Sequence, residues 1–167
     1  TGISGYLLLD GSFKEMFITS LDLNADVSES IRFNNEPSSF SGGISYSDSM
    51  LTIFNPVTLS IGKSLVAVEG YADYANKLLN LNVDLTEASS SLINYFWSDT
   101  LKGGKATGSM KINGAFDKTS LDADLVINDF EYNDITLSNF ELNAKIDDLS
   151  NHRTGVVKTK FNNGLWN

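Results

Sequence analysis

Residues 110–116, with the sequence MKINGAF, place apolar side chains two positions apart at Met110 and Ile112, then glycine at 114 and an aromatic residue at 116. Two other stretches follow the same spacing, Leu7-Leu9-Gly11-Phe13 and Val66-Val68-Gly70-Ala72. An apolar residue at every second position predicts a β-strand with one apolar and one polar face. Almost every other segment alternates in the same way. We therefore predict an all-β protein of about a dozen strands, joined as an antiparallel meander.

The glycines of this repeated strand predict curvature. Glycine inside a strand usually marks a bulge, a bend or the close approach of another backbone. A sheet of this many strands rarely stays open and flat, and instead curls, splits into two layers or closes. We therefore predict a curled antiparallel meander sheet that forms an apolar groove, with a closed β-sandwich as the alternative.

The period of two is interrupted once. After Thr86, a plausible helix cap, residues 87–97 place four apolar side chains on one face of a helix: Leu92, Ile93, Phe96 and Trp97. We predict one short amphipathic helix near 87–97. Because its polar side lacks flanking Lys or Arg, we expect it to pack on the sheet rather than to contact a membrane interface.

Composition excludes several classes of function. The chain has 12 Lys and Arg against 21 Asp and Glu, a net charge of -9 and no basic cluster, which argues against nucleic acid as a partner. No apolar run approaches the roughly 18 residues of a membrane helix, so we expect no transmembrane segment in this fragment. With 41% hydrophobic residues and no cysteine, the 167 residues suit one β-rich domain, 1–167. Because the chain opens at Thr1 without Met, we expect a fragment of a longer chain.

Candidate chemical sites are few and weak. His152 is the only histidine and lies in a polar turn, where an exposed loop histidine is the usual case. Residues 22–26 begin like a calcium loop, but Val27 and Phe33 stand where glycine and the closing glutamate are required. Asp122 and Asp124 alternate as strand residues do, and nothing indicates a cleft around them. We therefore predict no enzymatic activity, no catalytic residue, no metal and no cofactor.

The inward-facing strand residues form the remaining candidate site. They make up a face rather than a catalytic constellation, and they contact either an apolar ligand such as a lipid in an open groove or each other in a packed core. The predicted ligand-contact residues of this groove face are Leu7, Leu9, Val66, Val68, Leu81, Val83, Met110, Ile112, Leu125 and Ile127.

Most of the chain resembles the repeat region of the TamB and AsmA-like bacterial envelope proteins. The resemblance rests on residues 104–146, with TGSMKINGAF at 107–116 and NDFEYNDITL at 128–137. Residues 78–116 also reproduce the family's arrangement of a strand, a short helix and a glycine-punctuated strand. The proline that often follows this strand in the family is replaced here by Asp117-Lys118, and the register before Phe54 is looser.

This resemblance implies a specific biology. The family's fold is a taco-shaped curled sheet, the β-taco, whose apolar trough is thought to conduct phospholipid acyl chains between the inner and outer membranes. It also implies a periplasmic protein anchored in the inner membrane, a role in outer-membrane assembly and an outer-membrane TamA-like partner. The alternative function is a self-contained β-sandwich for adhesion or carbohydrate binding, with exposed aromatic residues stacked on sugars: Tyr71, Tyr74, Tyr132 and Trp166.

Overall fold

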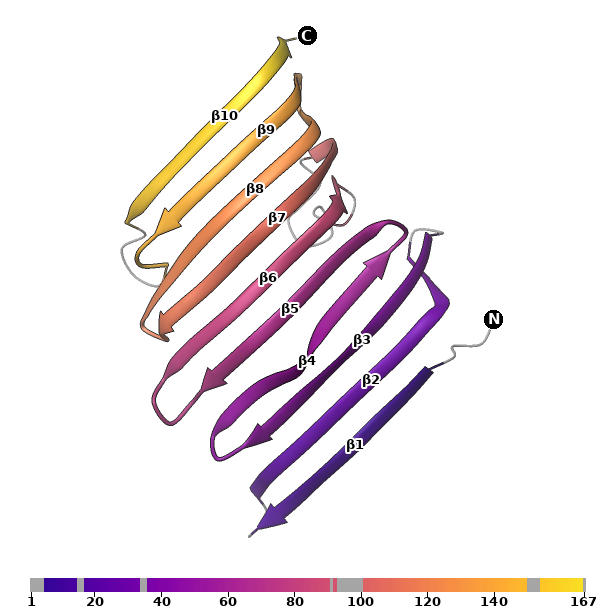
Figure 1. Ribbon diagram of the computed structural model, residues 1–167, viewed down its shortest axis with the longest axis vertical. Helices are drawn as coiled ribbons and strands as arrows, with labels where there is room; N and C mark the ends of the chain where they lie inside the picture. Colours follow the sequence, from indigo (N-terminus) through magenta and orange to yellow (C-terminus); the bar gives the residue numbers. More distant parts are fainter. Residues whose placement is uncertain are drawn as a thin grey trace.

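The computed structural model describes residues 5–14, 17–33, 36–90, 92, 101–149 and 154–166. These residues form one ten-stranded antiparallel sheet whose spatial order equals the chain order, as Figure 1 shows. The predicted all-β antiparallel meander is therefore confirmed. The strands are β1 (Gly5–Lys14), β2 (Phe17–Phe33), β3 (Glu36–Ser47), β4 (Met50–Ile61), β5 (Ser64–Asp73), β6 (Leu78–Ser89), β7 (Leu101–Ala115), β8 (Lys118–Tyr132), β9 (Ile135–Ile146) and β10 (Gly155–Trp166).

The strands are fewer and longer than the sequence predicts. The sequence predicts separate strands at 50–54 and 57–61, with a break at Asn55-Pro56, but they merge into β4, whose register shifts between Ile53 and Val57. The strands predicted at 121–127 and 130–132 likewise merge into β8 around Asp129, whose φ is 53°. A bulge adds a residue to one strand and bends it without ending the ladder. Local polar residues therefore interrupt the alternation without interrupting the sheet.

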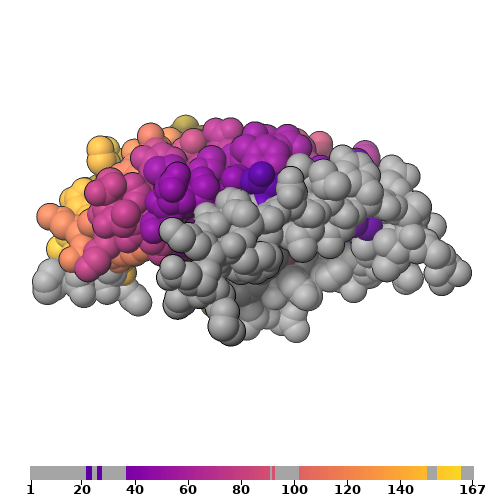
Figure 2. All heavy atoms as spheres, turned by 90° about the horizontal axis from the view of Figure 1, so that it is seen from below, coloured from indigo at the N-terminus to yellow at the C-terminus, as the bar shows by residue number. Residues whose placement is uncertain are grey.

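The strong curl and the closed sandwich are both wrong. In the described residues β1 pairs only with β2 and β10 only with β9, so the sheet does not close. Figure 2 shows its described part as a shallow arch. The glycines explain the difference, because Gly70 and Gly108 each accommodate one neighbouring backbone, at Asn80 and Asp124 respectively. These close approaches are local and lie between different strand pairs, so they do not add up to one bend.

The helix predicted near 87–97 begins too early. Glu87 and Ser89 belong to β6, and of the predicted helix the structure describes only Ser90 and Leu92 in helical conformation. Ser91 and residues 93–100 lie outside the described residues, and with them Ile93, Phe96 and Trp97. Leu92 is described, and it is buried. Among the residues that the structure describes, no helix is long and apolar enough to cross a membrane.

Backbone hydrogen bonds connect successive turns along the ends of the strands. Tyr74 N donates to Ser49 O (2.8 Å), and Phe116 N donates to Lys77 O (2.9 Å). At the β5–β6 turn, Asp73 accepts hydrogen bonds from Asn76 N at 2.9 Å and from Asn76 Nδ2 at 2.8 Å. These bonds, that from the Asn76 side chain above all, hold the pKa of the Asp73 carboxyl below its ordinary value.

Asp73→Asn is expected to lower the melting temperature at pH 7. The variant is also expected to lose less stability than wild type when the pH is lowered. A carboxylate with a lowered folded pKa stabilises the fold above its unfolded pKa of about 3.9, and this contribution disappears as the pH falls through the folded value. Circular dichroism melts at pH 7 and pH 3 should show a gap between wild type and variant that narrows at pH 3. An equal gap at both values would contradict this assignment.

Candidate functional site

Cross-strand pairing places the predicted ligand-contact residues on one side of the sheet. Directly opposed residues of neighbouring strands share a face. Val83 pairs with Val68 on one side and with Met110 on the other. Pairing and alternation extend this relation to every predicted residue whose side chain is described: Val66, Val68, Leu81, Val83, Met110, Ile112, Leu125 and Ile127. We call this side of the sheet the apolar face.

The backbone pairing of β1 with β2 places Leu7 and Leu9 at positions that alternate in register with the apolar face. Leu7 pairs with Ala25, and Leu9 pairs with Leu23. Leu23 in turn pairs with Ile44 of β3. The side chains of Leu7 and Leu9 lie outside the described residues, so for these two positions the structure gives the register alone.

The apolar face is larger than the predicted set. Four further strands contribute apolar residues in the same register, and the sequence signal for them is the same alternation of apolar and polar residues. The additional described members include Ile44, Ile53, Val57, Leu59, Phe140, Leu142, Val157 and Phe161. Their contact with a ligand, like that of the predicted set, stays a prediction.

The opposite side of the sheet, the polar face, is joined by hydrogen bonds between directly opposed side chains. Each bond links a pair in the backbone register. The pairs are Ser41–Thr58 (2.7 Å), Asn82–Glu69 (3.2 Å), Ser120–Asn113 (2.9 Å), Asn139–Asn128 (3.2 Å), Lys160–Glu141 (3.3 Å) and Asn143–Asp124. A slip of one strand breaks its polar pairs, so these bonds fix the register that keeps apolar residues together on the other face.

Burial varies across the apolar face. One described cluster is buried, and it is formed by Ile61, Ala88, Leu92 and Ala106. Val66 and Ile127 are half-buried beside this cluster. Towards β10 the face is open, since Val157 is 57% and Phe161 61% exposed. The described residues therefore offer an apolar surface that is covered near one end of β4–β8 and uncovered at β10.

The exposed area of the chain fits a single layer rather than a sealed core. The chain exposes 11057 Å², against about 8100 Å² expected for a compact monomer of 18.2 kDa. None of the large side chains in the described part is completely buried. Large contiguous apolar patches on proteins usually mark an interaction site. This arrangement can shelter an apolar ligand against one face while the polar face remains in water.

Two shallow hollows lie on the other side of the sheet. One, of about 520 Å³, has Asp124, Glu141 and Lys158 in its lining, and the other, of about 350 Å³, lies beside Glu69 and Asp84. Opposite charges are mixed in the first hollow, and Glu141 there already pairs with a lysine. Carboxylates outnumber lysines in the second hollow, but all four of them are exposed, so neither hollow resembles a site for acid–base chemistry; these carboxylates are Glu69, Asp84, Asp122 and Asp124.

The candidate carboxylates of β2 and those of β8 lie far apart in the sheet, whereas Asp122 and Asp124 line the second hollow together. Asp22 and Asp26 are exposed on β2, and Asp122 and Asp124 are exposed on β8. The described residues contain no group of three or more side chains able to hold a metal ion. His152 lies outside the described residues.

The aromatic residues predicted for sugar stacking do not form one platform. Tyr74 follows β5 in the turn to β6, whereas Tyr132 ends β8 at the opposite end of the strands. Tyr71 is half-buried on the polar face, and the side chain of Trp166 lies outside the described residues. Of the predicted residues, Tyr132 stacks on Phe130 with ring centroids 6.5 Å apart, and Phe130 stacks in turn on Phe140 at 5.1 Å.

Comparison with known proteins supplies one match. The family model described as "TamB, N-terminal domain" matches residues 3–164. No curated protein and no solved structure matches the chain.

Proposed function

Since this chain belongs to the TamB N-terminal domain family, we propose that its apolar face contacts phospholipid acyl chains in a protein of the bacterial cell envelope. The observation that carries the proposal is the apolar face that the strands from β2 to β10 share across their bulges, opposed by a polar face on the same strands. Transfer of acyl chains from water to such a surface is favourable by about 25 cal/mol per Å² of apolar area buried.

The polar face supports the same role. The net charge of -9 and the polar pairs across the strands keep one side hydrated. A single-layer antiparallel sheet can keep one face in water while its other face offers an apolar surface to a ligand. Conduction of phospholipid along the face, between inner and outer membranes, follows as the proposed activity, with a contribution to outer-membrane assembly.

Family membership also guides the proposed setting. We place the chain in the periplasm, as part of a longer protein anchored in the inner membrane and working with an outer-membrane TamA-like partner. No enzymatic step is needed for this function, because acyl chains move along the face by exchange of apolar contacts. The adhesion or carbohydrate function loses its support because the sandwich on which it depended is absent.

Purified chain is expected to retain phospholipid. Native mass spectrometry, with solvent extraction of the co-purifying material, should show adducts of phospholipid mass that are replaced when a different phosphatidylcholine is added. Soluble oligosaccharides serve as the comparison ligands.

A folded, lipid-free chain that also refuses added phospholipid would overturn the proposed function. Saturable binding of an oligosaccharide in the same experiment would restore the carbohydrate alternative.

A further inference from the structure

The segment at the end of β6 leaves the sheet through a bulge that changes which residues face the apolar side. Leu85 pairs with Gly108 and Ala88 pairs with Ala106, so Thr86 and Glu87 together oppose the single residue Thr107. Glu87 has a φ of 48°, which a non-glycine residue adopts only under local constraint. The extra residue returns Ala88 to the apolar face, where it is 1% exposed.

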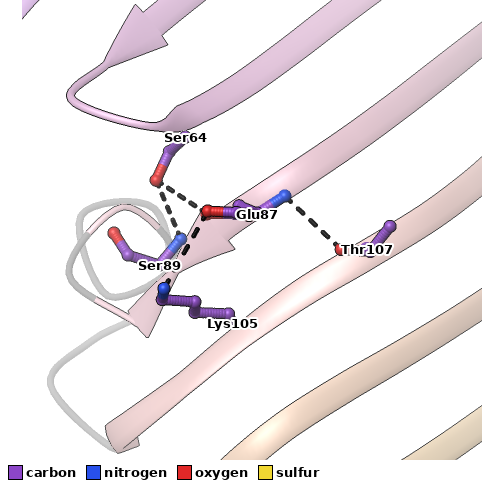
Figure 3. A network of polar contacts seen from close by, with 5 residues as sticks. All are labelled: Ser64, Glu87, Ser89, Lys105 and Thr107. Atoms are coloured by element: carbon purple, nitrogen blue, oxygen red, sulfur yellow. Dashed lines mark hydrogen bonds and ion pairs between the residues drawn. The ribbon is translucent and has the colours of Figure 1, made fainter.

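Ser64 holds this bulge in place. Its hydroxyl donates to Glu87 O at 2.9 Å and accepts from Ser89 N at 3.1 Å, as Figure 3 shows. Ser64 is itself buried at the start of β5. On the other side, Glu87 N donates to Thr107 Oγ1 at 3.4 Å. The 3.9 Å ion pair between Lys105 and Glu87 is exposed and contributes little.

The bulge leads directly to Leu92, which is 3% exposed. Leu92 packs with Ile61, Ala88 and Ala106, and Val66 and Ile127 pack against this cluster. Val66 and Ile127 both belong to the predicted ligand-contact set. The cluster to which Leu92 belongs therefore covers part of the side chains that an acyl chain would contact.

We propose that Leu92 is a built-in competitor for the apolar ligand, latched over this end of the apolar face by Ser64. The proposal rests on the proposed function, because it assigns a regulator to the same face. Ligand and Leu92 bury the same side chains, so binding there requires Leu92 to leave, and the apparent affinity is reduced by the fraction of molecules in which it is seated. Loosening the latch or shortening Leu92 raises that affinity.

Titration with a pyrene-labelled phosphatidylcholine tests this directly. Leu92→Ala is expected to lower the apparent Kd roughly tenfold, and Ser64→Ala to lower it by a smaller factor. Leu137→Ala is the matched control, since Leu137 is a buried leucine of β9 outside the cluster. This control removes the same atoms from a buried leucine and is expected to give no gain in affinity.

The outcomes separate the two proposals. Equal binding by folded wild type and Leu92→Ala overturns the competitor role and leaves the proposed function standing, whereas no binding by either overturns both. If Leu92→Ala does not fold, hydrogen–deuterium exchange on wild type decides: lipid should speed exchange in the peptide that contains Ala88 and Leu92. Slower exchange there on adding lipid would show that lipid packs over Leu92 and would overturn the inference.

Discussion

Gly108→Ala is expected to destabilise the fold by about 3 kcal/mol, a drop of roughly 6–12 °C in melting temperature for a chain of this size. Gly108 has a φ of 144°, a backbone conformation that residues with a side chain rarely adopt. A methyl group there would overlap the backbone carbonyl oxygen of Asp124 on the neighbouring strand. Because Gly108 and Leu125 are paired in the middle of the β7–β8 ladder, the strain cannot be relieved without separating the two strands.

Gly103→Ala, in the same strand, is the matched control. A methyl group at Gly103 approaches only the carboxylate end of the exposed Glu131 side chain, with the nearest atoms at 3.1 Å. That side chain can move, so we expect a change below about 0.5 kcal/mol, as for ordinary surface substitutions. Thermal unfolding followed by circular dichroism measures both variants. Similar melting temperatures for Gly108→Ala and wild type would show that the close approach of β7 and β8 is not required.

Side-chain alternation was sufficient to predict that residues such as Val68, Val83 and Met110 lie on the same side of the sheet, although it did not give all the members of that face. Val68, Val83 and Met110 come from three strands, yet the register brings them into one row. This worked because a period of two fixes which side of its strand each residue occupies, and a meander with short turns keeps neighbouring strands in matching phase. The resemblance to the TamB family, drawn from the glycine-punctuated strands, is confirmed by the family model over 3–164.

The number of strands and the curvature depend on information that alternation does not contain. A polar residue such as Asp129 ends a strand in one protein and forms a bulge in another, and the choice depends on whether the partner strand continues. Curvature depends on where in the sheet a glycine lets two neighbouring backbones approach closely. Gly70 approaches the backbone of β6 and Gly108 that of β8, and the positions of these glycines in the sequence do not reveal which strand each one meets.

The start of the predicted helix failed for a related reason. Thr86 and Glu87 have the composition of a helix N-terminus, but they form the bulge that pairs with Thr107. The decisive contact comes from Ser64, which lies more than twenty residues earlier in the chain and is held there by the β5–β6 register. The local sequence therefore predicts a helix start here, but a hydrogen bond that exists only once the sheet has formed stabilises a bulge instead.

Met110→Asp is expected to reduce retained phospholipid about tenfold or more while the chain remains folded. Met110 lies on the apolar face between Val83 and Ala123. It is only half-buried in the chain without ligand, so an aspartate there keeps access to water. Covering the same carboxylate with an acyl chain removes that water without supplying a partner, which costs several kcal/mol, and about 1.4 kcal/mol suffices for a tenfold loss.

Ser109→Asp provides the matched control for this prediction. Ser109 is the adjacent residue of β7, but it is exposed on the polar face, where it pairs with Asp84 and Asp124. Both variants add one negative charge to the same strand, and Ser109→Asp adds it opposite two carboxylates, so a greater loss of lipid from Met110→Asp reports the face and not the charge. Extracted phospholipid per chain should fall for Met110→Asp and remain near the wild-type value for Ser109→Asp. Equal losses in two folded variants would assign the effect to overall charge and would contradict lipid contact at the apolar face.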